Sequence, residues 1–413
     1  MVRRGTGPIL IGGILALAMG GCIGEPNESG SPESSSVASD SPTSASTEPT
    51  EHVPASAVPQ PSETAAPLTL TWEQPEGFDG QPAELIVDGE TWVAAGWASE
   101  RGPAAWTSSD AQTWLPADVV DPEPTEQFRG SGLGPTVRLG DSLLSFGTFI
   151  GCCDGRGVLG WRSGDGTSWE VIESDSPLFE RGYLIREVAV GDPALVAVEI
   201  QYGEFSGRLW RWTEEASWVE TTPGAGSDEP SGIEPNDVIW AEDRFVAVGA
   251  RGEPILNRKP PIGASWSSED GQTWQESTPV PELEGVRLTT VAPLAGGGYA
   301  ALGYDEVPAG EQVVPVAFTS PDGLAWSAVE DPFGGSRFLP HDLVPVAGGL
   351  VAFGGTADGI VVWVTDDGRS WTGAGQFGVE YQAAAVMGSQ IAVITADSQS
   401  DVGWQIHRAT VER

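Results

Sequence analysis

The sequence predicts an all-β fold, and three patterns carry that prediction. A nine-residue unit, aromatic at its first position and Trp at its ninth, recurs along the chain. Seven short apolar runs recur with starts 41 to 54 residues apart. The 413 residues include 55 Gly and 33 Pro, a composition rich in turn-forming residues. Many short strands joined by tight turns account for all three patterns.

The nine-residue unit is predicted to be a tight β-hairpin. Its copies are Trp106–Trp114, Trp161–Trp169, Trp266–Trp274, Phe318–Trp326 and Trp363–Trp371, with a degenerate copy at Trp210–Trp218. The Asp-Gly centre suits a type I turn followed by Gly in the left-handed conformation. We expect the two Trp of a copy to face each other across the hairpin, and the Asp to bind turn N–H groups. Ala111 and Glu215 replace the Gly, which predicts strained or differently shaped turns there.

This unit resembles the Asp-box, or BNR, repeat of sialidase-like and sortilin-like β-propellers. The family's box reads Ser-x-Asp-x-Gly-x-Thr-Trp, and here it is one residue shorter between Asp and Gly. The resemblance covers the repeating part of the chain and implies a propeller whose boxes lie on the face opposite the ligand site. It therefore implies structural roles for Asp110, Asp165, Asp270, Asp322 and Asp367. It does not select an activity, because enzymes, receptors and assembly factors share the repeat.

The apolar runs set the number of blades. They are Thr91–Gly96, Leu143–Gly147, Ala194–Val198, Arg244–Gly249, Gly298–Gly303, Gly349–Gly354 and Gln390–Ile394. Each follows another short strand and precedes a hairpin, which is the order of a four-stranded blade. The last blade has only three strands, so we expect 68–73 to supply its fourth, with Trp72 replacing the absent Trp. The prediction is a seven-bladed β-propeller of four-stranded antiparallel blades over 68–413, closed by an N-terminal strand.

Residues 1–21 have the pattern of a lipoprotein signal peptide. Arg3 and Arg4 precede an apolar run, Ile9–Met19, that is too short to span a bilayer comfortably. The residues before Cys22 resemble a bacterial lipobox, with Met19 where Leu is usual. This resemblance implies lipidation of Cys22, palmitate included, and a location on the extracellular face of the bacterial cytoplasmic membrane. The alternative is an ordinary secretory signal cleaved nearby, with Cys22 incidental.

Residues 22–67 are predicted to form a flexible tether. Beyond Cys22 they are rich in Ser, Pro, Thr, Glu and Ala and contain no aromatic residue. Such a stretch buries too little apolar surface to offset the entropy lost on ordering. We expect the tether to hold the propeller away from the membrane.

The net charge of -39, from 59 acidic and 20 basic residues, argues against nucleic acid as a partner. The chain has no phosphate-binding Gly-rich loop, no zinc signature and no Gly-x-Ser-x-Gly elbow. His52, His341 and His407 have no metal-ligand spacing. We therefore expect no cofactor and no metal, and a monomer that contacts the membrane only through its anchor.

Several Arg residues lie close to strands that are expected to line the central channel. They are Arg129, Arg181, Arg186, Arg287 and Arg337, and His341 and Asp342 lie beside the last. Converging Arg side chains can bind a carboxylate through paired N–H bonds. Surface Arg residues paired with the abundant Asp and Glu are the alternative explanation.

Sialidases hold their sugar acid with three Arg, the first of them in an Arg-Ile-Pro-like motif that is absent here. No Tyr in this chain matches the context of the family's nucleophile; the five are Tyr183, Tyr202, Tyr299, Tyr304 and Tyr381. We therefore expect a non-catalytic binding platform for an envelope protein or glycan. A sialidase-like glycoside hydrolase of the exo-α-sialidase type is the alternative.

Cys152 and Cys153 are the only thiols left if Cys22 is lipidated. An exported chain meets oxidising conditions, so these two are expected to pair with each other or with another molecule. Adjacent Cα atoms lie closer than the usual disulfide span, so a bridge between them would be strained. A rigid clip in the loop is the preferred interpretation, and redox sensing is the alternative.

Overall fold

The computed structural model describes thirteen stretches of the chain. They are residues 67–73, 76–98, 102–120, 132–148, 158–172, 183–192, 194–201, 207–213, 216–223, 232–252, 260–305, 313–396 and 403–413. All of them belong to one compact unit, Ala66–Arg413. Within these stretches no helix is long and apolar enough to cross a membrane.

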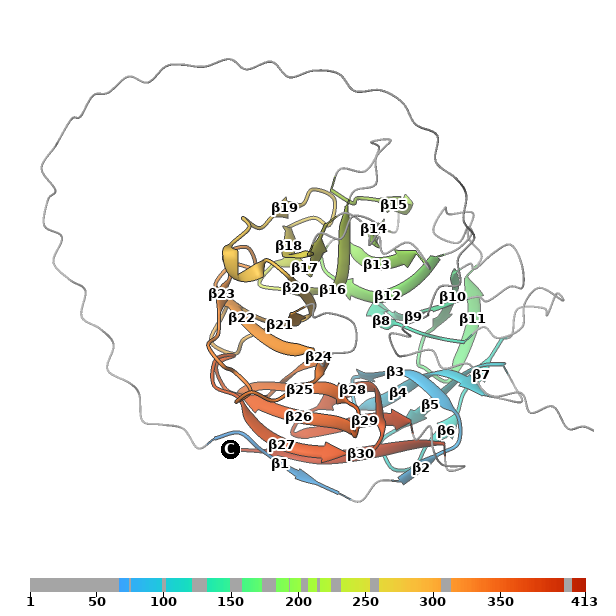
Figure 1. Cartoon of the computed structure of the whole chain (residues 1–413). Helices are drawn as coiled ribbons and strands as arrows, with labels where there is room; N and C mark the ends of the chain where they lie inside the picture. Colours follow the sequence, from blue (N-terminus) through green and yellow to red (C-terminus); the bar gives the residue numbers. More distant parts are fainter. Residues whose placement is uncertain are drawn as a thin grey trace, which may run out of the picture. The chain divides into compact units, whose positions relative to one another are not determined.

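Seven antiparallel sheets stand around a common axis, each one blade of a β-propeller, which confirms the predicted fold (Figure 1). Blade 1 consists of β3 (Gln81–Asp88), β4 (Thr91–Ala98), β5 (Gly102–Ser108) and β6 (Leu115–Pro116). Blade 2 consists of β8 (Thr136–Leu139), β9 (Ser142–Thr148), β10 (Val158–Ser163) and β11 (Ser168–Ile172). Blade 3 consists of β12 (Tyr183–Val190), β13 (Leu195–Gln201), β14 (Gly207–Thr213) and β15 (Ala216–Glu220).

Blades 4 to 6 repeat this order from the axis outward. Blade 4 consists of β16 (Ile233–Ala241), β17 (Arg244–Arg251), β18 (Ile262–Ser268) and β19 (Gln275–Glu276). The 3-10 turn η3 (Pro281–Leu283) leads to blade 5, which consists of β20 (Val286–Pro293), β21 (Tyr299–Asp305), β22 (Val314–Ser320) and β23 (Ser327–Ala328). Blade 6 consists of β24 (Leu339–Val346), β25 (Gly349–Thr356), β26 (Gly359–Thr365) and β27 (Thr372–Phe377).

Blade 7 combines both ends of the described chain and closes the ring, as predicted. Its strands β28 (Glu380–Met387), β29 (Gln390–Ala396) and β30 (Trp404–Glu412) are joined on the outer edge by β1 (Thr69–Trp72). In register, Trp72 corresponds to Trp274 of blade 4. Its indole packs edge-on against Phe377 of blade 6 at 4.8 Å and donates a hydrogen bond to Ala374 O at 3.0 Å. The closing strand therefore also ties blade 7 to blade 6.

The closure extends further than the predicted strand. A second segment, β2 (Glu76–Phe78), pairs with the other half of β30. Phe78 then packs against Trp106 at 4.9 Å and Trp114 at 5.5 Å in blade 1. One N-terminal stretch thus connects three consecutive blades.

The second strand of each blade is apolar because both of its faces are covered. Along β13, Val196 and Val198 pack with residues of blade 4, whereas Leu195 and Ala197 pack with residues of blade 2. Residues on alternate sides of a strand point to opposite faces, so a strand between two blades needs apolar side chains on both. The hydrophobic core is accordingly divided into layers between neighbouring blades.

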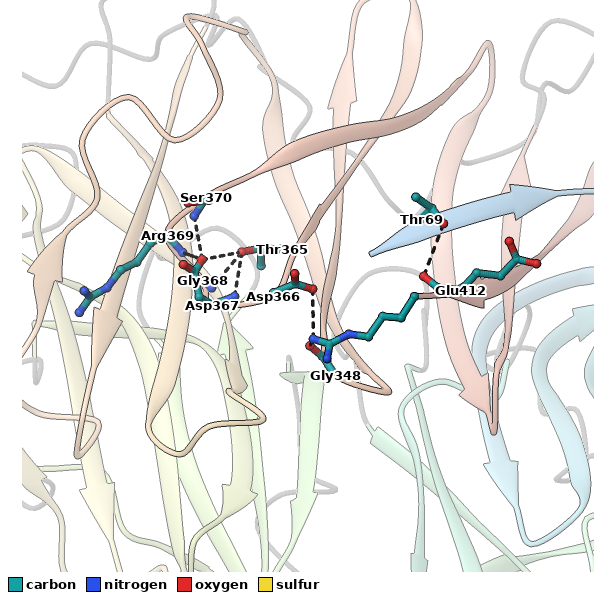
Figure 2. Close-up of polar contacts among 10 residues, drawn as sticks. Thr69, Gly348, Thr365, Asp366, Asp367, Gly368, Arg369, Ser370 and Glu412 are labelled. Carbon is teal, nitrogen blue, oxygen red and sulfur yellow. Dashed lines mark hydrogen bonds and ion pairs between the residues drawn. The ribbon is translucent and has the colours of Figure 1, made fainter. Parts of the chain in front are cut away.

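The hairpins that carry Asp110, Asp165, Asp270, Asp322 and Asp367, called the Asp hairpins below, have the predicted turns. In blade 6 the Asp367 carboxylate accepts N–H bonds from Arg369 and Ser370, both at 2.8 Å, and the Thr365 hydroxyl accepts one from Gly368 at 2.9 Å (Figure 2). Gly166, Gly271, Gly323 and Gly368 have φ between 68° and 78°. Ala111 has φ 53°, so the strain predicted for that copy is confirmed.

Two details of the prediction differ in the structure. The two Trp of a hairpin are not opposite each other: Trp266 lies across from Glu276, because the turn shifts Trp274 by two residues. In blade 6, Phe333 instead lies between the two indoles, 5.3 Å from Trp363 and 5.4 Å from Trp371. In addition, a short strand β7 (Asp118–Val119) pairs in parallel with β11 and gives blade 2 a fifth strand.

Candidate functional site

Near its start, the innermost strand of six blades contains a β-bulge. The register shifts lie between Pro82 and Glu84, Ile185 and Glu187, Pro235 and Asp237, Leu288 and Thr290, Pro340 and Asp342, and Tyr381 and Ala383. Strands alternate in direction within a blade, so the start of the innermost strand and the Asp hairpin lie at opposite ends. The bulges thus form a tier at the face away from the hairpins, and bulges commonly re-aim side chains beside functional sites.

Four carboxylates and one phenol occupy this tier. They are Glu84, Glu187, Asp237, Asp342 and Tyr381, here called the axial cluster, and they come from β3, β12, β16, β24 and β28. These innermost strands surround the ring axis in Figure 1. All five side chains are half-buried, so water still reaches them.

The charges of the axial cluster act on one another across the ring. The pKa of Glu187 is raised well above its usual value by burial first, and then by the charges of Asp237, Glu84 and Asp342. Glu84 and Asp342 come from blades 1 and 6, which are not neighbours of blade 3, so their charges act on Glu187 from across the ring. The cluster is therefore a single electrostatic unit.

Burial is the main cause of the raised pKa at the other carboxylates too. It raises the pKa of Glu84 to about 8, and the charge of Asp342 adds to the effect. The pKa of Asp237 rises to about 6, although the Val291 N–H bond at 2.8 Å opposes the rise. Carboxyl groups of this kind hold protons near neutral pH, which is a common property of functional sites.

The Tyr381 hydroxyl donates a hydrogen bond to the Asp342 carboxylate, and this bond links the phenol to the carboxylates of the cluster. Burial, followed by the charge of Asp342, raises the pKa of Tyr381 well above its usual value. The phenol therefore stays protonated and acts as a hydrogen-bond donor. Asp342 also accepts the N–H of Leu343 at 2.6 Å, so its position is fixed from two sides.

The bulge residues themselves form a second polar layer beside the axial cluster. Arg186 Nη1 donates to Asn236 Oδ1 at 3.1 Å, and Asn236 Nδ2 donates to Leu288 O at 2.9 Å, which links blades 3, 4 and 5. The ring of His341 lies parallel to that of Tyr381 at 5.9 Å. Burial, and then the charge of Arg186, lowers the pKa of His341 to about 4, so the imidazole is neutral at pH 7.

Of the predicted ligand-binding residues, the structure places His341 and Asp342 in this region. Arg287 lies on β20 and forms an ion pair with Glu234 of blade 4, and Arg337 is exposed in the connection before β24. The other predicted site residues, Arg129, Arg181, Cys22, Cys152 and Cys153, lie outside the described residues. Of the Arg residues predicted to converge at the axis, Arg186 acts on His341 through its charge.

Sequence reasoning missed Glu84, Glu187, Asp237 and Tyr381. A signal for three of the four carboxylates is present in the repeats, because Pro-x-acid-apolar opens the innermost strand at Pro82–Leu85, Pro235–Val238 and Pro340–Leu343. Aligning the blades on these strands would have found it. Among the described residues, no three His, Cys, Asp or Glu side chains are grouped closely enough to hold a metal ion.

The sequence matches no family model, and no curated protein is a detectable relative. Among solved structures, the polysaccharide lyase Uly1 has 9% sequence identity over 80% of this chain and 89% of its own, with a TM-score of 0.52. The β-propeller domain of the Trilobed protease from Pyrococcus furiosus has 11% identity over 81% and 96%, with a TM-score of 0.49. An α-L-arabinanase from Penicillium chrysogenum has 12% identity over 67% and 92%, with a TM-score of 0.42. The similarity to Uly1 supports the fold.

Proposed function

We propose that this chain is a ligand-binding β-propeller whose ligand enters at the ring axis, on the face opposite the Asp hairpins. The axial cluster is the observation that carries the proposal. Packing alone does not explain four carboxylates from four blades gathered at one level, because each raised pKa marks a cost to folding. Groups held in unfavourable surroundings are frequent at functional sites.

The chemistry of the cluster favours a ligand rich in hydrogen-bond donors. None of the ion pairs among the described residues involves a carboxylate of the axial cluster, that is, Glu84, Glu187, Asp237 or Asp342. An ammonium or guanidinium group, or the hydroxyls of a sugar, would satisfy these oxygens. The corresponding ligands in a cell envelope are a basic protein segment and a glycan, and an acidic sugar would be repelled.

We place the protein outside the cell, on a lipid anchor at Cys22 and a tether over 22–67. The lipobox-like residues before Cys22 and the composition of the tether support this location. The Asp-box-like repeats support membership of the sialidase-like and sortilin-like propellers, in which the boxes serve the architecture.

A glycoside hydrolase is the second candidate, and the axial carboxyls favour it. A protonated carboxyl beside an ionised one is the arrangement that glycosidases use for acid and nucleophile or base. The hydrogen bond between Tyr381 and Asp342 supplies a phenol and carboxylate pair. An exo-α-sialidase requires several Arg for the sugar acid, and Arg287 already pairs with Glu234.

Calorimetric titration of the intact protein tests the proposal. The probes are tetralysine, a tetramer of glucosamine and a tetramer of N-acetylglucosamine, which separate charge from the sugar framework. We expect binding of at least one probe, and we expect Glu187→Gln together with Asp342→Asn to weaken it by at least about tenfold, the loss of a charge-assisted contact.

Asp322→Asn is the matched control, because it removes a carboxylate at the opposite face and should leave the affinity unchanged. Equal weakening by the control, or no binding of any probe, contradicts the proposed site. Release of reducing sugar from neutral oligosaccharides, or of a fluorophore from sialosides, would instead support the hydrolase.

A further inference from the structure

Glu199 is a buried acid that the axial site does not use. It lies on β13 with a side chain that is 0% exposed. One carboxyl oxygen accepts the indole N–H of Trp210, and the other, Oε1, has no hydrogen-bond partner. A buried oxygen without a partner costs free energy, and more so when it is charged.

The position of Glu199 in the repeat makes it an exception. By strand register, the equivalent residue is Gly96, Gly147, Gly249, Gly303, Gly354 or Thr395 in the other blades. A side chain at Gly249 would collide with Glu234 O, 2.0 Å from an added Cβ. Only blade 3 therefore places an acid at this position.

Glu199 is paired with the bulge that supports part of the binding layer. It is opposite Ile185 on β12, and the register shift between Ile185 and Glu187 leaves Arg186 as the bulged residue. Arg186 reaches Asn236 in blade 4, and Glu187 belongs to the axial cluster. A change at Glu199 therefore acts on the strand segment that positions both side chains.

The charged groups around Glu199 are few. Arg208 on β14 is opposite Glu199, and its charge and the indole bond from Trp210 favour the ionised form, whereas Glu220 on β15 disfavours it. From blade 2, on the same side of β13, the packed residues are the apolar Leu144 and Phe146. On β12 the nearest charged side chains, Arg186 and Glu187, belong to the binding layer. Burial is the dominant influence and raises the pKa of Glu199 to about 7.

We propose that Glu199 is a proton-dependent positioning residue: protonated, it supports the blade 3 bulge, and ionised, it loosens the bulge and weakens ligand binding at the axis. On ionisation the carboxyl O–H bond breaks and the proton passes to water, leaving a charge in an apolar layer. The effect on the bulge is independent of any ligand. The effect on binding rests on the proposed function.

The indole N–H resonance of Trp210 tests the first step. In the intact protein it is assigned by its loss in Trp210→Phe, and its shift is followed from pH 5 to 9. We expect a titration with a midpoint near pH 7 that is absent in Glu199→Gln. A resonance that does not move, or that moves equally in Glu199→Gln, overturns the proposal.

Amide hydrogen exchange tests the second step. Between pH 6 and 8, after correction for the intrinsic rate, protection of residues 183–190 should fall by about tenfold, the equivalent of one pKa unit. The matched segment 233–241 of blade 4, paired with Gly249, should not change. Glu199→Gln should abolish the pH dependence; Glu199→Gly, which copies blade 4, is the second variant if Gln disturbs folding. Equal pH profiles in the two segments contradict the proposal.

Titrations with the probes named for the axial site test whether ionisation of Glu199 weakens ligand binding at the ring axis. Because the axial carboxyls also titrate in this range, the measured quantity is the affinity of the wild-type protein for the best-binding probe relative to that of Glu199→Gln. This ratio should fall between pH 6 and 8. If no probe binds, the proposed function fails while the resonance and exchange results still decide the role of Glu199. If a probe binds with the same pH dependence in both proteins, the coupling is wrong and the binding site stands.

Discussion

The acidic side chains of the axial cluster and those of the Asp hairpins are the same chemical groups in opposite surroundings. Backbone N–H bonds from Thr113 and Gln112 lower the pKa of Asp110 to about 2, whereas burial raises the pKa of Glu84 to about 8. The hairpin carboxylates thus stabilise the fold when ionised, and the axial ones destabilise it. In blades 1, 4 and 6 the hairpin end carries a carboxylate with a lowered pKa, and the axial end carries one with a raised pKa, whose ionisation costs stability.

The largest expected effect comes from removing the closure on which both ends depend. Deletion of residues 68–78 removes β1, β2 and the buried Leu68 and Phe78. We expect a loss of about 5 kcal/mol in the free energy of unfolding and a fall in Tm of about 10 °C or more, measured by calorimetry. Deletion of 50–60, in the predicted tether, is the control. An unchanged Tm in the 68–78 deletion would mean that the ring does not need its N-terminal strands.

The second-largest expected effect is a loss of stability when a carboxylate is removed from an Asp hairpin. Asp322→Ala removes the acceptor of N–H bonds from Leu324 at 2.9 Å and Ala325 at 2.8 Å. We expect a loss of about 1–2 kcal/mol at pH 7, because charge-assisted bonds at an exposed turn are partly screened. The pKa of Asp322 is lowered by these bonds, so its contribution is present above pH 4 and fades at lower pH. Urea unfolding at pH 7 and pH 2.5 measures the loss of unfolding free energy and its dependence on pH. An equal loss at the two pH values would show that the ionised carboxylate is not the cause.

Removing a carboxylate from the axial cluster is expected to increase the stability of the protein. The folded pKa of Glu84 is raised, so its ionisation costs stability as pH rises from about 4.5 to about 8 and costs nothing below that range. Glu84→Gln should therefore stabilise the protein by about 1–2 kcal/mol at pH 8 and leave it unchanged at pH 4. Thermal unfolding at the two pH values is the measurement. A gain of equal size at pH 4 would assign the effect to packing and not to charge.

The smallest effect concerns the one Asp hairpin with Ala in place of Gly. Ala111→Gly relieves a left-handed backbone worth about 1 kcal/mol but removes a methyl group that is 2% exposed, worth about 0.8 kcal/mol. We expect a net change below about 0.5 kcal/mol, seen as a nearly constant urea midpoint. A loss above about 2 kcal/mol would show that the methyl group packs far better than its area suggests.

The repeats made much of the fold predictable. The spacing of the apolar runs set seven blades, and the missing fourth strand identified the closing segment around Trp72. The Asp-Gly spacing fixed the turn, as the φ of Gly271 confirms. The opposition of Trp266 and Trp274 was predicted wrongly, because the register depends on how many residues the turn consumes. A turn type alone does not set it.

The candidate site was only partly predictable, because its residues are far apart in the sequence. His341 and Asp342 were selected because they lie beside Arg337, but Glu84 and Glu187 are far from them in sequence and belong to other blades. The Pro-x-acid pattern marks three such positions without indicating that they meet. Likewise, nothing in the local sequence of Arg287 indicates its partner Glu234 in the preceding blade.

The sequence by itself determined the elements that depend on neighbouring residues: the hairpins, the alternation of buried strands and the count of blades. These follow from turn chemistry and periodicity, which act over a few residues. Only the tertiary structure decided which acids meet at the axis and which acid in blade 3 is buried without a full set of partners. Those properties depend on charge and solvent across the ring, where the chain brings together groups hundreds of residues apart.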